Sequence, residues 1–248
     1  MLAVLLIVIL RAVVTEVAQD VIEVRYPRGY LHWDRSGKIA NDLLLRFPGI
    51  EVDEGSPAEV TLSHKDEQVT FVYGVQLARV VLIPKSAQSD KLGDYANEFI
   101  NIVLRNLEVK TLTRVAQRVI YHILTESKAE AEERLEKFAK RHHAGANVLS
   151  SSGDERLSAK KLRELMLRFE DEKTGINITL KAGESVFNIT GPNSDELRPH
   201  IPPPKYFLVF SADIYTKQPL AAAELIVSEL IRSNDKLVST RLLPLFTD

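Results

Sequence analysis

The chain has no cysteine, and this excludes three kinds of chemistry at once. Without thiols there is no disulfide, no thiolate metal site and no cysteine nucleophile. Basic residues are not in excess either, because 32 lysines and arginines stand against 34 acidic residues, for a formal net charge of -2. Proteins that neutralise many phosphates usually carry a basic excess. We therefore do not favour nucleic acid as a partner, and the lack of cysteine fits the reducing conditions of a cytoplasmic protein.

Familiar catalytic and cofactor motifs are missing as well. The P-loop, the dinucleotide glycine pattern, Gly-x-Ser-x-Gly, His-Glu-x-x-His and the EF-hand spacing do not occur. The sequence therefore indicates no cofactor and no metal site. It leaves enzymatic activity open and favours a protein that is not an enzyme.

No apolar run reaches the roughly 20 residues of a membrane-spanning helix. Residues 1–20 begin with the apolar stretch Leu2–Leu10, which Arg11 interrupts. A secretory signal would place its positive charge before the apolar stretch, and here the charge comes after it. We interpret this N-terminal segment as a buried strand or helix that leads into the fold. A membrane anchor or export segment, and a start site placed too far upstream, are the alternatives.

What the chain does contain is one order of elements that occurs twice. Each pass has an apolar strand, an amphipathic helix, several short strands and a second amphipathic helix. The first pass runs from Val21 to Leu107 and the second from Arg114 to Arg232. We therefore expect an α+β protein of two similar β-α-β(n)-α halves, residues 21–110 and 111–248. Their antiparallel sheet would form one fused domain with the helices packed on one face.

Alternating apolar residues predict the strands, and apolar residues at helical spacing predict the helices. In the first half, the expected strands are Val21–Tyr26, Ile50–Val52, Glu59–Leu62, Val69–Tyr73 and Gln76–Ile83, with helices over 31–47 and 91–106. In the second half, the expected strands are Arg114–Tyr121, Leu162–Phe169, Ile176–Leu180, Val186–Ile189 and Tyr206–Tyr215, with helices over 127–142 and from Pro219 onward. A serine loop at 150–153 and a proline-rich connector at 191–205 separate the later strands. Val238–Phe246 is expected to close the chain as an edge strand through which two copies could associate.

Two groups of residues are candidates for binding a partner. Trp33 and Arg35 lie in the first turn of the first helix. A tryptophan at this position usually packs on the core and holds the start of the helix in place. Beside an arginine, it could instead contact a partner protein. The second group belongs to the nucleic-acid alternative, which expects basic residues gathered on one face of the sheet; the candidates are Arg25, Arg79, Arg114, Arg118 and Lys181.

Two other constellations have an ordinary interpretation and a catalytic or metal-binding one. Asp53, Glu59 and Lys65 could be the acidic and basic groups of a metal-dependent nuclease, although charges beside turns are usually just solvated. His142 and His143 are neighbours on a helix and diverge by about 100°, so they do not readily share a metal ion. Cationic side chains at this helix C-terminus are more simply explained by the helix dipole.

One stretch of the second half resembles a known family. Leu112–Ile120, which reads Leu-Thr-Arg-Val-Ala-Gln-Arg-Val-Ile, is similar to the Leu-x-Arg-Val-Gly-Leu-Arg-Tyr-Ile-Asn strand of a sporadically distributed family of uncharacterised bacterial proteins. Val24–Tyr26 and Phe47–Pro48 resemble the same family, whereas Ala116 and Tyr121 depart from its glycine and asparagine. The resemblance implies a bacterial cytosolic protein and no particular activity. The repeated element order is also similar to the TATA-binding-protein fold, an analogy that does not transfer DNA binding.

These observations favour a non-catalytic protein-binding or assembly module. Its exposed sheet face or its late edge strand would receive another protein or a second copy of the chain. A nucleic-acid-binding protein that uses the sheet face is the alternative, and a metal-dependent nuclease is the second alternative. A membrane is expected as a partner only if the N-terminal apolar segment is an anchor.

Overall fold

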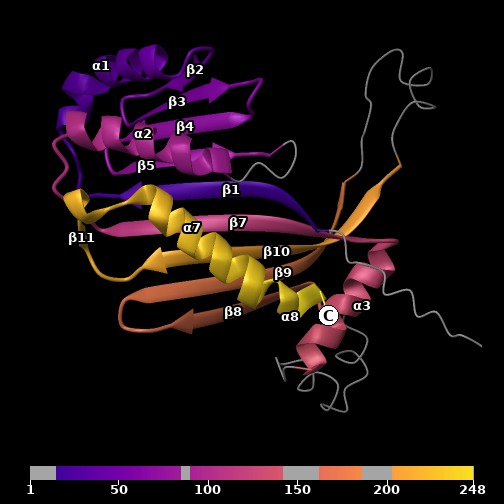
Figure 1. The fold of residues 1–248 in the computed structure, drawn as a ribbon. Coiled ribbons are helices and arrows are strands. Elements are labelled where there is room, and N and C mark those ends of the chain that lie inside the picture. Colours follow the sequence, from indigo (N-terminus) through magenta and orange to yellow (C-terminus); the bar gives the residue numbers. More distant parts are fainter. Residues whose placement is uncertain (1–14, 85–89, 142–161, 186–202, 248) are drawn as a thin grey trace, which may run out of the picture.

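The computed structural model describes residues 15–84, 90–141, 162–185 and 203–247. Several expected features lie outside these residues: the N-terminal apolar stretch, the serine loop, His142 and His143, the strand Val186–Ile189 and nearly all of the proline-rich connector. The described residues form a nine-stranded antiparallel sheet with helices on one side (Figure 1). The strand order is β2-β3-β4-β5-β1-β7-β10-β9-β8.

The first half contains five strands of this sheet and two helices. In chain order they are β1 (Thr15–Arg25), α1 (Leu31–Arg46), β2 (Glu51–Gly55), β3 (Glu59–His64), β4 (Val69–Gly74), β5 (Leu77–Leu82) and α2 (Asp90–Asn106). A positive φ of 92° at Gly49 turns the chain between α1 and β2, a conformation that glycine adopts without strain.

The second half repeats this order with four strands in the large sheet. Its elements are β6 (Thr111–Leu112), β7 (Arg114–Thr125), α3 (Lys128–Arg141), β8 (Glu164–Glu170), β9 (Thr174–Ser185), β10 (Lys205–Thr216), β11 (Leu220–Ala221), a 3-10 turn η2 (Ala222–Glu224), α7 (Val227–Leu237), a π-helical turn η3 (Val238–Leu242) and α8 (Pro244–Thr247). Ser127 Oγ accepts from the Glu130 amide at 3.2 Å, as expected for a helix cap before α3.

The two halves meet where β1 pairs with β7. The antiparallel register runs from Thr15 opposite Ile123 to Arg25 opposite Arg114, with one irregularity between Val17 and Gln19. From this seam outward the order is β1, β5, β4, β3, β2 on one side and β7, β10, β9, β8 on the other. The predicted fold class, two similar β-α-β(n)-α halves that share one antiparallel sheet, is confirmed.

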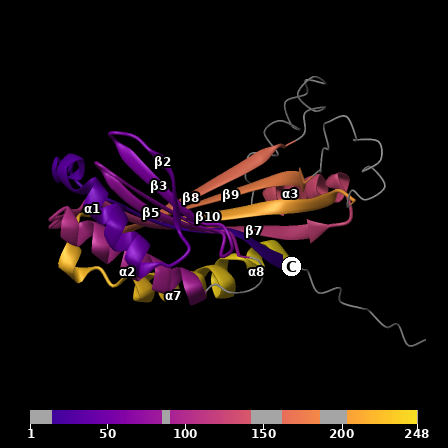
Figure 2. The same cartoon turned by 90° about the horizontal axis from the view of Figure 1, so that it is seen from above.

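The described helices all pack on one face of the sheet. Figure 2 shows α1, α2, α7 and α8 on the same side of the strands. Each helix presents an apolar stripe to inward-facing strand residues, so the hydrophobic surface of both layers is removed from water. No helix among the described residues is long and apolar enough to cross a membrane.

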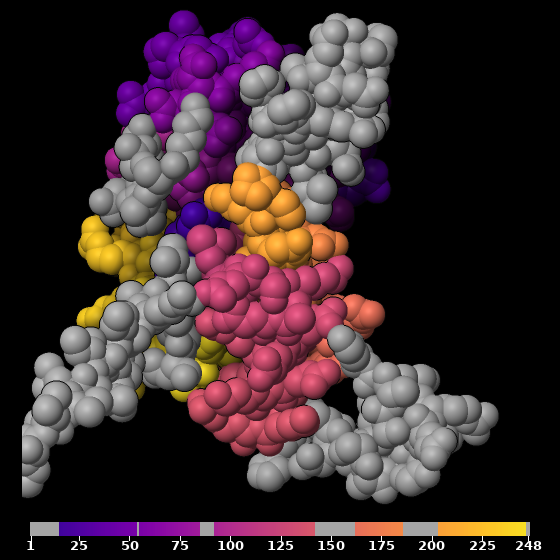
Figure 3. Space-filling view, turned by 90° about the vertical axis from the view of Figure 1, so that its right-hand side faces the viewer, coloured from indigo at the N-terminus to yellow at the C-terminus, as the bar shows by residue number. Residues whose placement is uncertain are grey.

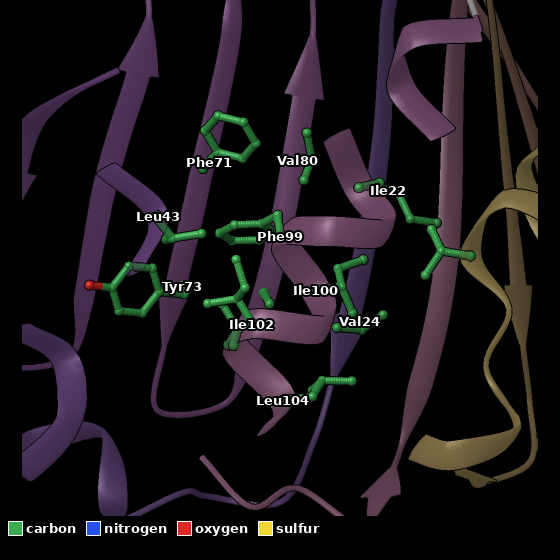
Figure 4. Packing of buried hydrophobic residues seen from close by; sticks show 14 of the residues in the cluster. Ile22, Val24, Leu43, Phe71, Tyr73, Val80, Phe99, Ile100, Ile102 and Leu104 are labelled. Atoms are coloured by element: carbon green, nitrogen blue, oxygen red, sulfur yellow. The ribbon is translucent and has the colours of Figure 1, made fainter. Parts of the chain in front are cut away.

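The first core lies between α1, α2, α7 and the first five strands. Phe99 of α2 points toward Phe71 of β4 and Leu43 of α1, and the two phenyl rings are 5.2 Å apart (Figure 4). Ile22 and Val24 of β1 complete this core with no exposed surface. Val227 and Ile231 of α7 join it, so a helix of the second half packs on the core of the first.

The second core lies under α3, η3 and α8. Leu135 of α3 packs on Phe210 of β10, and Phe246 of α8 has its ring 5.0 Å from that of Phe210. Figure 3 views the molecule from the end at which α3 (pink) forms the surface. Both cores use the same face of the sheet, because Ile214 of the second core lies opposite Gln117, which in turn lies opposite Ile22 of the first core.

Three expectations about elements are corrected. Val238–Phe246 is helical rather than an edge strand, because Val238, Leu242 and Phe246 recur at helical spacing and bring their apolar side chains to the second core. Self-association through an edge strand at these residues is therefore wrong. Pro219 does not open the last helix, since Leu220 pairs with the buried Leu112 of β6 and the helix begins at Val227. The first strand begins at Thr15 rather than at Val21.

Candidate functional site

The face of the sheet opposite the helices, which we call the open face, carries the candidate site. Side chains alternate between the two faces of a strand. Ile22 and Val24 of β1 are buried under the helices, so Glu23 and Arg25 project from the open face. None of the described helices packs on this face.

A depression with a volume of about 410 Å³ lies on the open face over the four central strands β5, β1, β7 and β10. Its charged lining residues are Glu23, Arg25, Arg79, Arg114, Arg118 and Asp213. Four guanidinium groups thus meet two carboxylates, which leaves an excess of two positive charges. We call these six residues the arginine cluster.

Strand register, and not proximity in the sequence, brings the cluster together. Residues directly opposite each other on neighbouring strands project from the same face. The opposite pairs are Glu23 and Arg79, Arg25 and Arg114, and Asp213 and Arg118. Each arginine therefore has a neighbour of the cluster on the adjoining strand.

Glu23 lies at the centre of the cluster and is shared by three arginines. Its Oε1 accepts from Arg25 Nε at 2.7 Å, and its carboxylate oxygens lie 3.8 Å from Arg79 Nη1 and from Arg114 Nη1. Its side chain is only 13% exposed. One carboxylate balances a single positive charge, so this sharing leaves the three guanidinium groups incompletely neutralised.

Arg114 is held in a fixed orientation. Its Nη2 donates to Asp213 Oδ2 at 2.9 Å, and its guanidinium carbon lies 4.8 Å from the centre of the Tyr215 ring. The Tyr215 ring lies against Gly175, where an added Cβ would collide with the ring. Glycine at this position therefore lets the aromatic ring lie on the sheet and support the guanidinium by a cation–π contact.

Arg79 and Arg118 retain donors that have no partner among the described residues. Arg79 Nε is buried and has no hydrogen-bond acceptor among the described residues. A buried donor without an acceptor is unfavourable by about 1–3 kcal/mol, so a group that supplies an oxygen here would be stabilised. Arg118 is exposed on the same depression, and no ion pair joins it to another described residue.

The structure divides the predicted binding residues into two groups. Arg25, Arg114 and Arg118 lie in the arginine cluster together with Arg79. Lys181 is on the same face but on β9, opposite Val209, and outside the depression. Trp33 and Arg35 lie on α1, in the helical layer, so they cannot belong to the same site.

Trp33 and Arg35 serve contacts within the first half. Trp33 is 48% exposed, and its Nε1 donates to the Pro57 carbonyl at 2.7 Å, which ties α1 to the loop before β3. Arg35 donates from Nη1 to the Asn106 carbonyl at 2.6 Å and from Nη2 to Glu108 Oε1 at 2.8 Å. These bonds connect α1 to the end of α2.

The residues of the nuclease hypothesis lie on β2, on β3 and in the turn that follows β3. Lys65 Nζ pairs with Glu51 Oε2 at 2.9 Å, an exposed ion pair at the end of β3. Within the ranges that the structure describes, no group of three or more histidine, aspartate or glutamate side chains could hold a metal ion.

A buried polar network on the helix face was not anticipated from the sequence. Gln117 of β7 has no exposed surface, and its Nε2 donates to Asp20 Oδ1 at 3.1 Å and to Asp235 Oδ1 of α7 at 2.8 Å. Burial, together with the Asp235 charge, raises the pKa of Asp20 to about 7. Burial also raises the pKa of Tyr121 to about 12. The signal in the sequence is Asp20 itself, which occupies an inward-facing position two residues before Ile22.

Comparison with known proteins adds little to this picture. No family model and no curated protein matches the chain. Among solved structures, Methanococcus jannaschii TBP is similar over 91% of this chain and 97% of its own, at 10% sequence identity and a TM-score of 0.27. So low a score gives no argument about function, and the class assigned here, a duplicated α+β sheet protein, rests on the strand order described above.

Proposed function

We propose that the protein is a non-catalytic protein-binding module whose open sheet face receives an acidic segment of a partner protein. The observation that supports this proposal is the arginine cluster, in which four guanidinium groups from three strands share two carboxylates. A sheet face on which none of the described helices packs offers a broad surface, and complementary charge supplies specificity and speeds association.

The distribution of charge favours a short acidic segment over a long polyanion. The excess of positive charge is confined to the central strands. On the open face, β2 and β3 carry Glu51 and Glu59. On the other side, β8 carries Glu164 and Glu170, which are balanced by Arg168 and by Lys181 of β9 opposite Glu164. A nucleic acid laid across the sheet would bring its phosphates close to these carboxylates, whereas a few acidic side chains at the centre would not.

Binding of synthetic peptides can test the proposal. A short peptide in which glutamate alternates with valine should bind in a salt-dependent manner, measured by fluorescence anisotropy against the same peptide with glutamine for glutamate. Arg118→Glu should weaken binding of the acidic peptide by about tenfold or more, because it reverses the charge of an exposed cluster residue. Arg232→Glu changes the net charge equally on the exposed side of α7 and should leave binding unchanged.

Two results would contradict the proposal. The first is equal affinity for the glutamate and glutamine peptides, which would show that the cluster does not select acidic groups. The second is a single-stranded or duplex oligonucleotide that binds more tightly than the acidic peptide at matched salt and loses affinity with Arg118→Glu. That result would favour nucleic acid as the ligand of this face.

A further inference from the structure

We propose that the arginine cluster binds a phosphoryl group on a serine, threonine or tyrosine side chain of the partner. This proposal rests on the proposed function and narrows it, because it names the chemical group that enters the depression. Under this proposal, the module binds phosphorylated segments of partner proteins.

The charge of the cluster matches a phosphate monoester. Two carboxylates, Glu23 and Asp213, stand among four arginines, so two positive charges have no counterpart in the depression. A phosphorylated side chain carries about −1.5 to −2 charges at neutral pH, whereas a carboxylate carries one. A single phosphoryl group can therefore neutralise the excess that would otherwise need two acidic side chains.

The available donors also suit a group with several acceptor oxygens. Arg79 lines the depression with a side chain that is 36% exposed, and its Nε has no acceptor among the described residues. Arg118 lines the same depression, and no ion pair joins it to another described residue. Arg114 lies beside them in an orientation fixed by Asp213 and by the Tyr215 ring. Arginine forks bind phosphate oxygens in pairs, and three terminal oxygens can accept from guanidinium groups that converge from different strands.

The surroundings provide room for the side chain that carries the phosphoryl group. Val21, Val81 and Ala116 line the depression beside the arginines, so its wall has an apolar part. The cavity volume of about 410 Å³ exceeds the size of a phosphoryl group and can admit the attached side chain. A backbone polyanion, in contrast, would extend beyond the depression to the carboxylates of Glu59 and Glu164 on flanking strands.

The test uses the full chain and three probes: inorganic phosphate, O-phosphoserine, and a pair of acidic peptides that differ only by phosphorylation of a central serine. NMR of the arginine side-chain N–H groups reports on Arg79 Nε directly. We expect a saturable shift of this resonance with each phosphate probe. We also expect the phosphopeptide to bind about tenfold or more tightly than its unphosphorylated twin. Arg118→Gln should weaken phosphate binding by at least severalfold.

Two further variants separate the cluster from general electrostatics. Arg79→Lys keeps the positive charge but removes the guanidinium group. It should therefore weaken binding of the phosphate probes more than binding of the unphosphorylated acidic peptide. Arg168→Gln removes a guanidinium from the same face outside the depression, where it pairs with Glu170, and should leave phosphate binding unchanged.

Four outcomes would overturn the proposal. The first is an identical shift with nitrate or chloride at equal ionic strength, which shows screening only. The second is equal affinity for the two peptides, which removes phosphate recognition but leaves the acidic-segment function standing. The third is an oligonucleotide that binds more tightly than the phosphopeptide at matched salt, which assigns the phosphate chemistry to nucleic acid. If neither peptide binds, the proposed function fails together with the inference.

Discussion

Gln117 of β7 donates from one amide nitrogen to both carboxylate oxygens of Asp20 on β1, at 3.1 and 3.4 Å. The two residues belong to different halves of the chain, and both are buried. The same nitrogen donates to Asp235 of α7, so the network joins the central seam of the sheet to the last long helix. Two carboxylates that share one neutral donor repel each other when both are ionised.

The contribution of Asp20 to the stability of the protein should therefore fall as the pH rises toward neutrality. The pKa of Asp20 is raised from 3.8 to about 7 in the folded chain, so the folded state binds this proton more tightly than the unfolded state. The contribution is fully present below pH 3.8 and is lost progressively up to about pH 7, amounting to about 4 kcal/mol. Urea unfolding across this range should show that the free energy of unfolding of the wild type, taken relative to that of Asp20→Asn, decreases as the pH rises. Equal slopes for the two proteins would refute this assignment. Because the other carboxylates titrate in both, the difference isolates Asp20.

Phe210 should be essential for the second core. It is fully buried between α3 and α8, so Phe210→Ala should reduce the free energy of unfolding by about 3–5 kcal/mol through lost burial and a residual cavity. Phe169→Ala is the matched control, because Phe169 on β8 is 52% exposed and should change stability by much less. Denaturant unfolding at fixed pH measures both values, and similar losses for the two variants would contradict the described core.

Gly175 should tolerate alanine only if Tyr215 is removed. An added Cβ would collide with the Tyr215 ring, so Gly175→Ala should destabilise the protein by about 1–3 kcal/mol. In a double-mutant cycle with Tyr215→Ala, the double variant should lose less free energy of unfolding than the sum of the losses in the two single variants. Gly37→Ala, on an exposed turn of α1 where nothing lies near the added Cβ, should instead stabilise the protein by about 0.5–1 kcal/mol. Strict additivity at Gly175 and Tyr215 would show that the ring is not what the glycine accommodates.

The two halves should unfold as one cooperative unit. β1 pairs with β7 along nearly its whole length, and α7 packs on the first core, so neither half can open without exposing the core of the other. Trp33 is the single tryptophan and reports on the first half alone. Its fluorescence transition in urea should coincide with the far-UV circular dichroism transition of the whole chain. An earlier midpoint for the fluorescence would mean that the halves are independent domains.

Local patterns in the sequence predicted most elements of the fold correctly. Alternation identified β1 around Val21–Tyr26, and apolar spacing identified α1 and α2, because these periods follow directly from strand and helix geometry. The same reasoning misassigned Val238–Phe246, whose β-branched and aromatic residues suggest a strand. Their burial at helical spacing against Phe210 decided the outcome, since packing on a core overrides weak local preference.

The candidate site was only partly accessible to the same reasoning. Arg25, Arg114 and Arg118 could be named because strand alternation places them away from the apolar side chains. Trp33 and Arg35 looked equally suited to binding a partner, and nothing in their local sequence separates them from the sheet arginines. Their separation follows from the packing of α1 on the opposite side of the sheet.

Two similar α+β halves could be predicted from the amino-acid order, because periodicity and turn residues act over a few neighbours. The pairing of β1 with β7 depends on long-range packing, and its register sets which charged side chains meet. Glu23 and Arg114 are far apart in the chain and come together because β1 and β7 pair in a single register. A shift by one residue would turn every side chain to the opposite face, and buried Ile22 and Val24 prevent that shift.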